Sequence, residues 1–103
     1  MRFRLSHQAL QDIRDIRAYT VERWGQDQWL HYFAAMSLAF ERLASDPSCG
    51  RKRDMLRRGM RSLSFERHLI FFQSPRDPQK PVAILRIVRD RRNLEAMSYH
   101  DDR

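Results

Sequence analysis

The sequence contains a single cysteine, Cys49, and no run of apolar residues long enough to cross a membrane. One thiol cannot form an internal disulfide, and a structural zinc site of the cysteine type needs several thiols. A membrane-spanning helix needs about 20 consecutive apolar residues, and the opening MRFRLSHQAL alternates charged with apolar residues, unlike a signal peptide. We therefore expect a cytoplasmic protein that makes no membrane contact and is stabilised by packing.

Glycine is scarce as well, and none of the three glycines lies in a GxGxxG or GK[ST] motif that would cradle phosphates. The histidines lack the HxxxH and HExxH spacings of metal sites. They are His7, His31, His68 and His100. The sequence therefore predicts no cofactor and no metal, and it contains no recognisable set of catalytic residues.

Basic residues are abundant, because 20 Lys and Arg against 13 Asp and Glu give a net charge of +7. All of the basic residues except Lys52 and Lys80 are arginine, which favours bidentate contacts to carboxylates or phosphates. The excess is concentrated in residues 48–62, SCGRKRDMLRRGMRS, where six basic residues accompany one acid, Asp54. Such a stretch suits a nucleic acid, an anionic membrane or an acidic protein, and its composition does not choose among them.

The first half of the chain has the pattern of a short strand followed by two helices. Residues 2–5 alternate polar and apolar side chains, and Ser6 can cap the helical repeat that follows. That repeat ends at Gly25, a typical C-cap residue, and a second repeat of the same period continues until Pro47. Two amphipathic helices joined at one glycine indicate an antiparallel helical hairpin.

The second half of the chain has the pattern of strands. Residues 62–66 alternate apolar with polar side chains, whereas HLIFFQ at 68–73 and VAILRIV at 82–88 are typical of buried strands. Three prolines between them, in residues 74–81, indicate a turn. The element order predicts one α+β domain over residues 1–103. In that domain the hairpin packs on a small, mainly antiparallel sheet, and the first strand joins an edge.

Arg86 interrupts the otherwise apolar strand at residues 82–88. A buried charge without a partner is costly, so this arginine either emerges on an exposed sheet face or pairs with an acid. Other arginines lie at strand ends of the same small sheet, which could bring them together. The candidate anion-binding surface consists of Arg57, Arg58, Arg61, Arg86, Arg89, Arg91 and Arg92. A solvated basic face explains the same residues, and both interpretations stay open.

Residues 5–51 resemble the helical hairpin of the ParE branch of the RelE/ParE toxins. That likeness rests on Ala9, Asp12, Ile13, Ile16, Tyr19, Trp24 and Gly25. The likeness continues through a Gly-x-Arg stretch, a strand with a histidine before an Ile-Phe-aromatic run, and a last strand that contains an arginine. The matching residues are Gly59, Arg61, His68, Ile70, Phe71, Phe72, Ile84, Arg86, Ile87, Arg91 and Arg92. The resemblance spans about residues 3–97 and preserves the order of the elements.

The resemblance implies the toxin of a type II toxin-antitoxin system, which regulates growth by inhibiting DNA gyrase through binding and without catalysis. It also implies a small acidic antitoxin that forms a hetero-oligomer with the toxin and neutralises it. A hairpin packed on one side of a small sheet leaves a groove and a free strand edge that such a partner can cover. We do not expect direct nucleic-acid binding.

The alternative function implied by the same superfamily is a RelE-like, ribosome-dependent mRNA endoribonuclease. In that case the catalytic residues are expected to be Arg61, Arg86, Arg91, Arg92 and Tyr99. The arginines would stabilise the charge that develops on the phosphate, and Tyr99 would transfer a proton.

Overall fold

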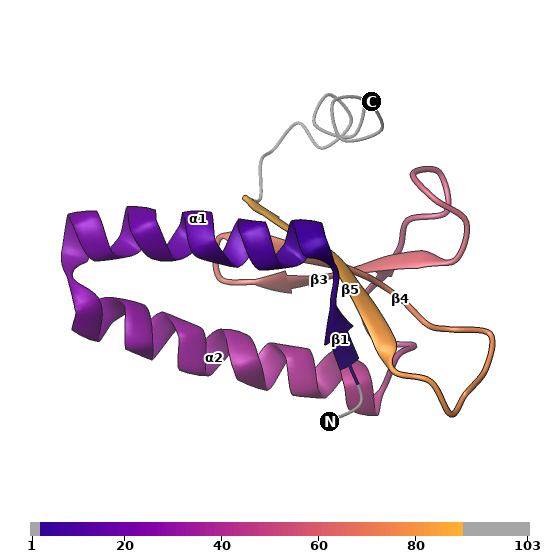
Figure 1. Ribbon diagram of the computed structural model, residues 1–103. Helices are drawn as coiled ribbons and strands as arrows, with labels where there is room; N and C mark the ends of the chain where they lie inside the picture. Colours follow the sequence, from indigo (N-terminus) through magenta and orange to yellow (C-terminus); the bar gives the residue numbers. More distant parts are fainter. Residues whose placement is uncertain (1–2, 90–103) are drawn as a thin grey trace.

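Two long helices and five strands make up the computed structural model, which describes residues 3–89. The two helices run side by side in opposite directions, with the sheet against them (Figure 1). The elements are β1 (Phe3–Leu5), α1 (His7–Trp24), α2 (Gln26–Ser45), β2 (Arg51–Lys52), β3 (Met60–Phe65), β4 (His68–Gln73) and β5 (Val82–Arg89). The predicted helical hairpin is confirmed, and Gly25, with φ of 93°, is the single residue that connects its helices.

The strands form one sheet in the order β1-β5-β4-β3-β2. The pairs β2–β3, β3–β4 and β4–β5 are antiparallel, and only β1 runs parallel to its neighbour, β5. The α+β class and the edge position of the first strand are therefore confirmed. The sequence pattern missed β2, because a strand of two exposed basic residues has no apolar alternation to reveal it.

The main core lies between the hairpin and one face of the sheet. Its fully buried side chains come from α2, β4 and β5, and the largest are Met36, Leu43, Ile70, Phe72 and Ile84. Strand β4 is buried on both faces, as its apolar run predicted, since Leu69 and Phe71 are buried as well as Ile70 and Phe72. Consecutive strand residues point to opposite faces, so Phe71 lies on the face away from this core. No helix within residues 3–89 is long and apolar enough to cross a membrane.

Strand β5 contains a bulge at Leu85. Its register against β4 pairs Ile84 with Phe72 and Arg86 with Phe71, so Leu85 is an extra residue on β5. The extra residue brings Ile84 and Ile87 to the same core although they are three positions apart. It also sets the position of Arg86 beside α1.

Candidate functional site

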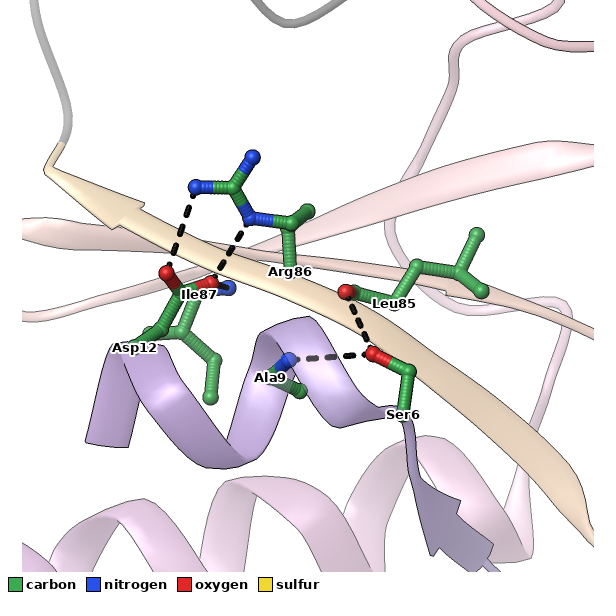
Figure 2. Close-up of polar contacts among 6 residues, drawn as sticks. All are labelled: Ser6, Ala9, Asp12, Leu85, Arg86 and Ile87. Atoms are coloured by element: carbon green, nitrogen blue, oxygen red, sulfur yellow. Dashed lines mark hydrogen bonds and ion pairs between the residues drawn. The ribbon is translucent and has the colours of Figure 1, made fainter. Parts of the chain in front are cut away.

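Asp12 on α1 forms hydrogen bonds with the middle of β5, at the edge of the strand that faces away from β4. The Oδ2 atom of Asp12 accepts a hydrogen bond from Arg86 Nε at 2.8 Å, and Oδ1 accepts one from Arg86 Nη2 at 3.2 Å (Figure 2). Oδ2 also accepts the backbone N–H of Ile87 at 2.9 Å. Of the two outcomes expected for Arg86, the structure therefore has the one in which it pairs with an acid. Both side chains are partly shielded, with 12% of Asp12 and 34% of Arg86 exposed.

The N-terminus of α1 is attached to the same part of β5. The Ser6 hydroxyl accepts the N–H of Ala9 at 3.0 Å, which caps the helix, and donates to the Leu85 carbonyl at 2.8 Å (Figure 2). The Ser6 N–H donates to the Ile84 carbonyl at 3.0 Å. Since β1 pairs with β5 only as far as Ile84, Ser6 and Asp12 continue the edge of the sheet where β1 ends.

A cleft of about 1180 Å³ lies beside this attachment. Its walls are the closed end of the helical hairpin, the β3–β4 turn and the last residues of β5. The residues that line it are Asp12, Asp15, Ile16, Tyr19, Thr20, Arg23, Trp24, Gln28, His31, Tyr32, Ala35, Glu66, Arg67, His68, Arg86, Ile87, Val88 and Arg89. We call it the hairpin–sheet cleft.

Aromatic and cationic groups gather at the closed end of the hairpin. The rings of Tyr19 and Trp24 meet edge to face at 5.9 Å, and the Arg23 guanidinium lies 4.8 Å from the centre of the Tyr19 ring. Trp24 is 62% exposed, which is unusual for so large an apolar side chain. The cluster therefore offers a cleft wall that combines apolar area with positive charge.

Tyr32 and His68 form a hydrogen bond between α2 and β4 at the base of the cleft. Their Oη and Nδ1 atoms lie 2.5 Å apart, and Tyr32 also packs against Phe65. Burial, followed by the charge of Glu66, raises the pKa of Tyr32 to about 12. Burial, followed by the charge of Arg89, lowers the pKa of His68. Near neutral pH the hydrogen bond therefore joins a protonated tyrosine to a neutral imidazole, which is a structural arrangement and not an activated base.

Besides Arg86, which is paired with Asp12, three arginines line the cleft, and each comes from a different segment of the chain. Arg23 lies at the end of α1, Arg67 in the β3–β4 turn and Arg89 at the end of β5. Arg89 was a candidate from the sequence, whereas Arg23 and Arg67 were not. Arg23 is one of three arginines on α1 and Arg67 is the single arginine of its turn, so no sequence signal marks either, and only the tertiary fold brings them to one cleft.

The arginines predicted from the sequence separate into two groups. Arg86 and Arg89 line the cleft, whereas Arg57 and Arg58 lie in the loop between β2 and β3. Two strands intervene between β5 and β2, which places their axes roughly 14 Å apart, three inter-strand spacings. The fold therefore does not gather the basic residues into one surface. The candidates Arg91, Arg92 and Tyr99 lie outside the described residues.

Arg61 occupies a third position, on β3 near the C-terminal end of α2. Its Nη1 atom lies 3.4 Å from the Gly50 carbonyl oxygen. Hydrogen bonds from Ser48 lower the pKa of the neighbouring Asp46, with smaller contributions from Arg42 and Arg61. Across β4, Arg61 aligns with Phe72 and Arg86 aligns with Phe71, so the two arginines start from opposite faces of the sheet.

Neither metal binding nor thiol chemistry has support in residues 3–89. No group of three or more His, Cys, Asp or Glu side chains in this range could hold a metal ion. Burial raises the pKa of the Cys49 thiol, which disfavours the reactive thiolate.

Comparison with known proteins identifies relatives over most of the chain. A family model described as the ParE toxin of the type II toxin-antitoxin system parDE matches residues 3–94. Toxin ParE1 of Caulobacter vibrioides is 32% identical over 71 residues, which are 69% of this chain and 74% of that protein. Toxin ParE1 of Mycobacterium tuberculosis is 36% identical over 72 residues, which are 70% of this chain and 74% of that protein.

One solved structure has a similar fold. A chain from the chromosomal ParDE TA system from P. aeruginosa matches with a TM-score of 0.73 and 22% identity, over 88% of this chain and 97% of that chain. At this identity the likeness concerns the fold alone.

Proposed function

We propose, from the premise that this chain belongs to the ParE toxin family of type II toxin-antitoxin systems, that it arrests growth by binding and inhibiting DNA gyrase. A small acidic antitoxin would neutralise it by forming a hetero-oligomer, and both partners would meet it in the cytoplasm. The family match over residues 3–94 is the observation that carries this proposal.

We propose that the hairpin–sheet cleft is the binding site for the antitoxin. It is concave, and it combines exposed aromatic surface at Trp24 with the cations Arg23, Arg67 and Arg89. An amphipathic, acidic segment would bury its apolar side chains against the aromatic wall and direct its carboxylates to these arginines. The charges would also speed association at low salt, because long-range attraction steers the encounter.

Variants that remove a positive charge test whether the antitoxin binds in the cleft. Arg67→Ala and Arg89→Ala should each slow association with the antitoxin about threefold or more at low ionic strength, and the difference should shrink as salt is added. Arg14→Ala removes the same charge from an exposed position on α1 that does not line the cleft, and it is the matched control. Equal association rates for all three variants would place the antitoxin elsewhere.

Inhibition by binding is favoured over mRNA cleavage by the arrangement of the arginines. The endoribonuclease alternative needs Arg61 and Arg86 to act on one phosphate. Arg61 lies on β3 and Arg86 on β5, the two start from opposite faces of the sheet, and the Arg86 guanidinium is bonded to Asp12. Such a pair does not converge on a single reacting group.

Two assays on the purified toxin separate these functions. Gyrase supercoiling of relaxed plasmid should stop at a stoichiometric excess of toxin. It should proceed normally when the toxin has been mixed with the antitoxin beforehand. Ribosome-bound mRNA should remain intact under the same conditions. Undiminished supercoiling would contradict the proposal, and cleavage that disappears in Arg86→Ala or Tyr99→Phe would establish the endoribonuclease instead.

A further inference from the structure

The loop that joins β2 to β3, together with β2 itself, forms a second basic surface. We call residues 51–59 the basic loop. Figure 1 shows it projecting past the end of the sheet, at the upper right. Its exposed cations are Arg51, Lys52, Arg57 and Arg58. Within residues 3–89 none of these four forms an ion pair, and none lines the hairpin–sheet cleft.

Asp54, the only acid of the basic loop, forms a hydrogen bond within the loop. Asp54 Oδ1 accepts the N–H of Gly59 at 2.9 Å, and Gln73 Nε2 on β4 donates to the Arg58 carbonyl at 3.1 Å. Further backbone bonds join Leu56 to Arg53 and Met60 to Arg57, each at 2.9 Å. The loop therefore has a defined shape, in which Asp54 and Arg53 are engaged in hydrogen bonds while Arg51, Lys52, Arg57 and Arg58 face solvent.

Met55 is the middle residue of the basic loop in the sequence and is 99% exposed. It belongs to no apolar patch of its own loop, because the neighbouring Leu56 is half-buried and the other flanking residues are charged. A fully exposed methionine between cations gains free energy only when a partner covers it. A partner that covers this loop would therefore gain from offering negative charge and an apolar contact within a few ångströms of each other.

We propose that the basic loop is a contact for double-stranded DNA, in which its cations bind phosphates and Met55 enters the minor groove. Duplex DNA has the required combination, since phosphates flank a groove in which a partly unstacked base step exposes apolar base faces. Projecting, cation-flanked protein elements commonly insert an apolar side chain at a base step in this way. An acidic protein segment fits less well, because the loop projects from the sheet (Figure 1) and none of its residues lines the hairpin–sheet cleft.

This contact goes beyond gyrase inhibition and does not require it. It departs from the expectation drawn from the sequence, in which direct nucleic-acid binding was not foreseen. The exposure of Met55 and the hydrogen bond between Asp54 and Gly59 are features of the folded loop that composition does not reveal. If the toxin also inhibits gyrase, the same loop could contact the DNA that gyrase holds.

The first test measures binding of the purified toxin to a fluorescent DNA duplex by anisotropy, over a series of salt concentrations and without gyrase. The double variant Arg57→Ala/Arg58→Ala should lower the slope of log K against log salt by about 2, since each phosphate contact contributes about 0.9. Arg14→Ala/Arg17→Ala removes the same charge from exposed positions on α1 and is the matched control. An equal loss of slope in both double variants would overturn the proposal.

The second test concerns the insertion of Met55 between base pairs. It uses duplexes labelled at both ends to detect bending by energy transfer. The toxin should bend the duplex, Met55→Leu should keep the bend, and Met55→Ala should lose it with little change in salt slope. An unchanged bend in Met55→Ala would overturn the role of Met55. Competition with polyglutamate completes the test, because displacement of DNA at equal charge concentration would show a generic anion site and contradict the proposal.

Discussion

Asp12 and Arg86 lie 74 positions apart in the sequence and join α1 to β5 through hydrogen bonds of 2.8 and 3.2 Å. The same carboxylate accepts the N–H of Ile87, two residues after the bulge at Leu85. One acid therefore serves as counter-ion for the arginine and as backbone partner for an open sheet edge. Because Arg86 and Ile87 also line the hairpin–sheet cleft, this contact sets the shape of one cleft wall.

Asp12→Asn should lower the free energy of unfolding by about 2 kcal/mol, because hydrogen bonds to charged groups contribute roughly 1.5–3 kcal/mol and this pair is only partly shielded. Urea unfolding followed by circular dichroism measures the change. Glu22→Gln, an exposed acid on the same helix, should change stability by less than about 0.5 kcal/mol. Equal stabilities for the two variants would mean that the Asp12–Arg86 contact contributes nothing measurable.

Gly50 and Gly25 provide a matched test of close packing at the sheet edge. Both have positive φ, 82° and 93°, but a Cβ atom on Gly50 would lie 2.3 Å from the Ser62 carbonyl oxygen, whereas one on Gly25 meets nothing within 4 Å. Gly25→Ala should cost about 2 kcal/mol of strain, because φ of 93° with ψ of 173° is a conformation that almost only glycine adopts, and Gly50→Ala about 4 kcal/mol, because the β2–β3 backbone must also move. Thermal unfolding of the two variants gives the comparison, and a smaller loss for Gly50→Ala would contradict this packing.

His68 should make the stability of the folded protein depend on pH. Its pKa in the folded state is lowered from the ordinary value of 6.5, mainly by burial. The unfolded chain therefore binds a proton first, so the stabilisation is complete above about pH 6.5 and is lost as the pH falls through the lowered pKa. Urea midpoints between pH 7.5 and pH 5 should fall less in His68→Gln than in the wild type. His31→Gln, which changes an exposed histidine on α2, should keep the wild-type dependence. A full pH dependence in His68→Gln would assign it to other groups.

Tyr32→Phe should remove the hydrogen bond to His68 Nδ1 and lower the free energy of unfolding by about 1 kcal/mol, with the ring packing retained. The tyrosinate absorbance titration should also lose the component with a pKa of about 12. Tyr19→Phe, which changes an exposed tyrosine on α1, is the control and should keep that component. If the high-pKa component survives in Tyr32→Phe, Tyr32 does not have the burial described here.

The elements of this fold were largely predictable, because apolar periodicity and a few capping residues mark them directly. Ser6, Gly25 and Pro47 bound the two helices, and β4 was recognisable as a strand buried on both faces. The bulge at Leu85 was not predictable, because an inserted residue leaves a run such as VAILRIV apolar throughout. Strand β2 was not predictable either, because both of its residues are charged and no apolar alternation marks it.

The site was less predictable than the fold, because it depends on distances between segments that are remote in the sequence. An acidic partner for Arg86 was one of two expectations, but nothing singled out Asp12 as that partner. The clustering of basic residues in 48–62 suggested one surface with Arg86 and Arg89, whereas the strand order separates the basic loop from the cleft. Arg23 and Arg67 became candidates only through the tertiary structure.

The most direct test of the central proposal is a titration of purified toxin into a gyrase supercoiling reaction, with gyrase at a concentration well above the expected Kd. An inhibitor that acts by binding should lower the supercoiling rate in proportion to the toxin added, and the rate should reach its minimum near one toxin per gyrase binding site. Supercoiling that continues undiminished at a large excess of folded toxin would contradict the account.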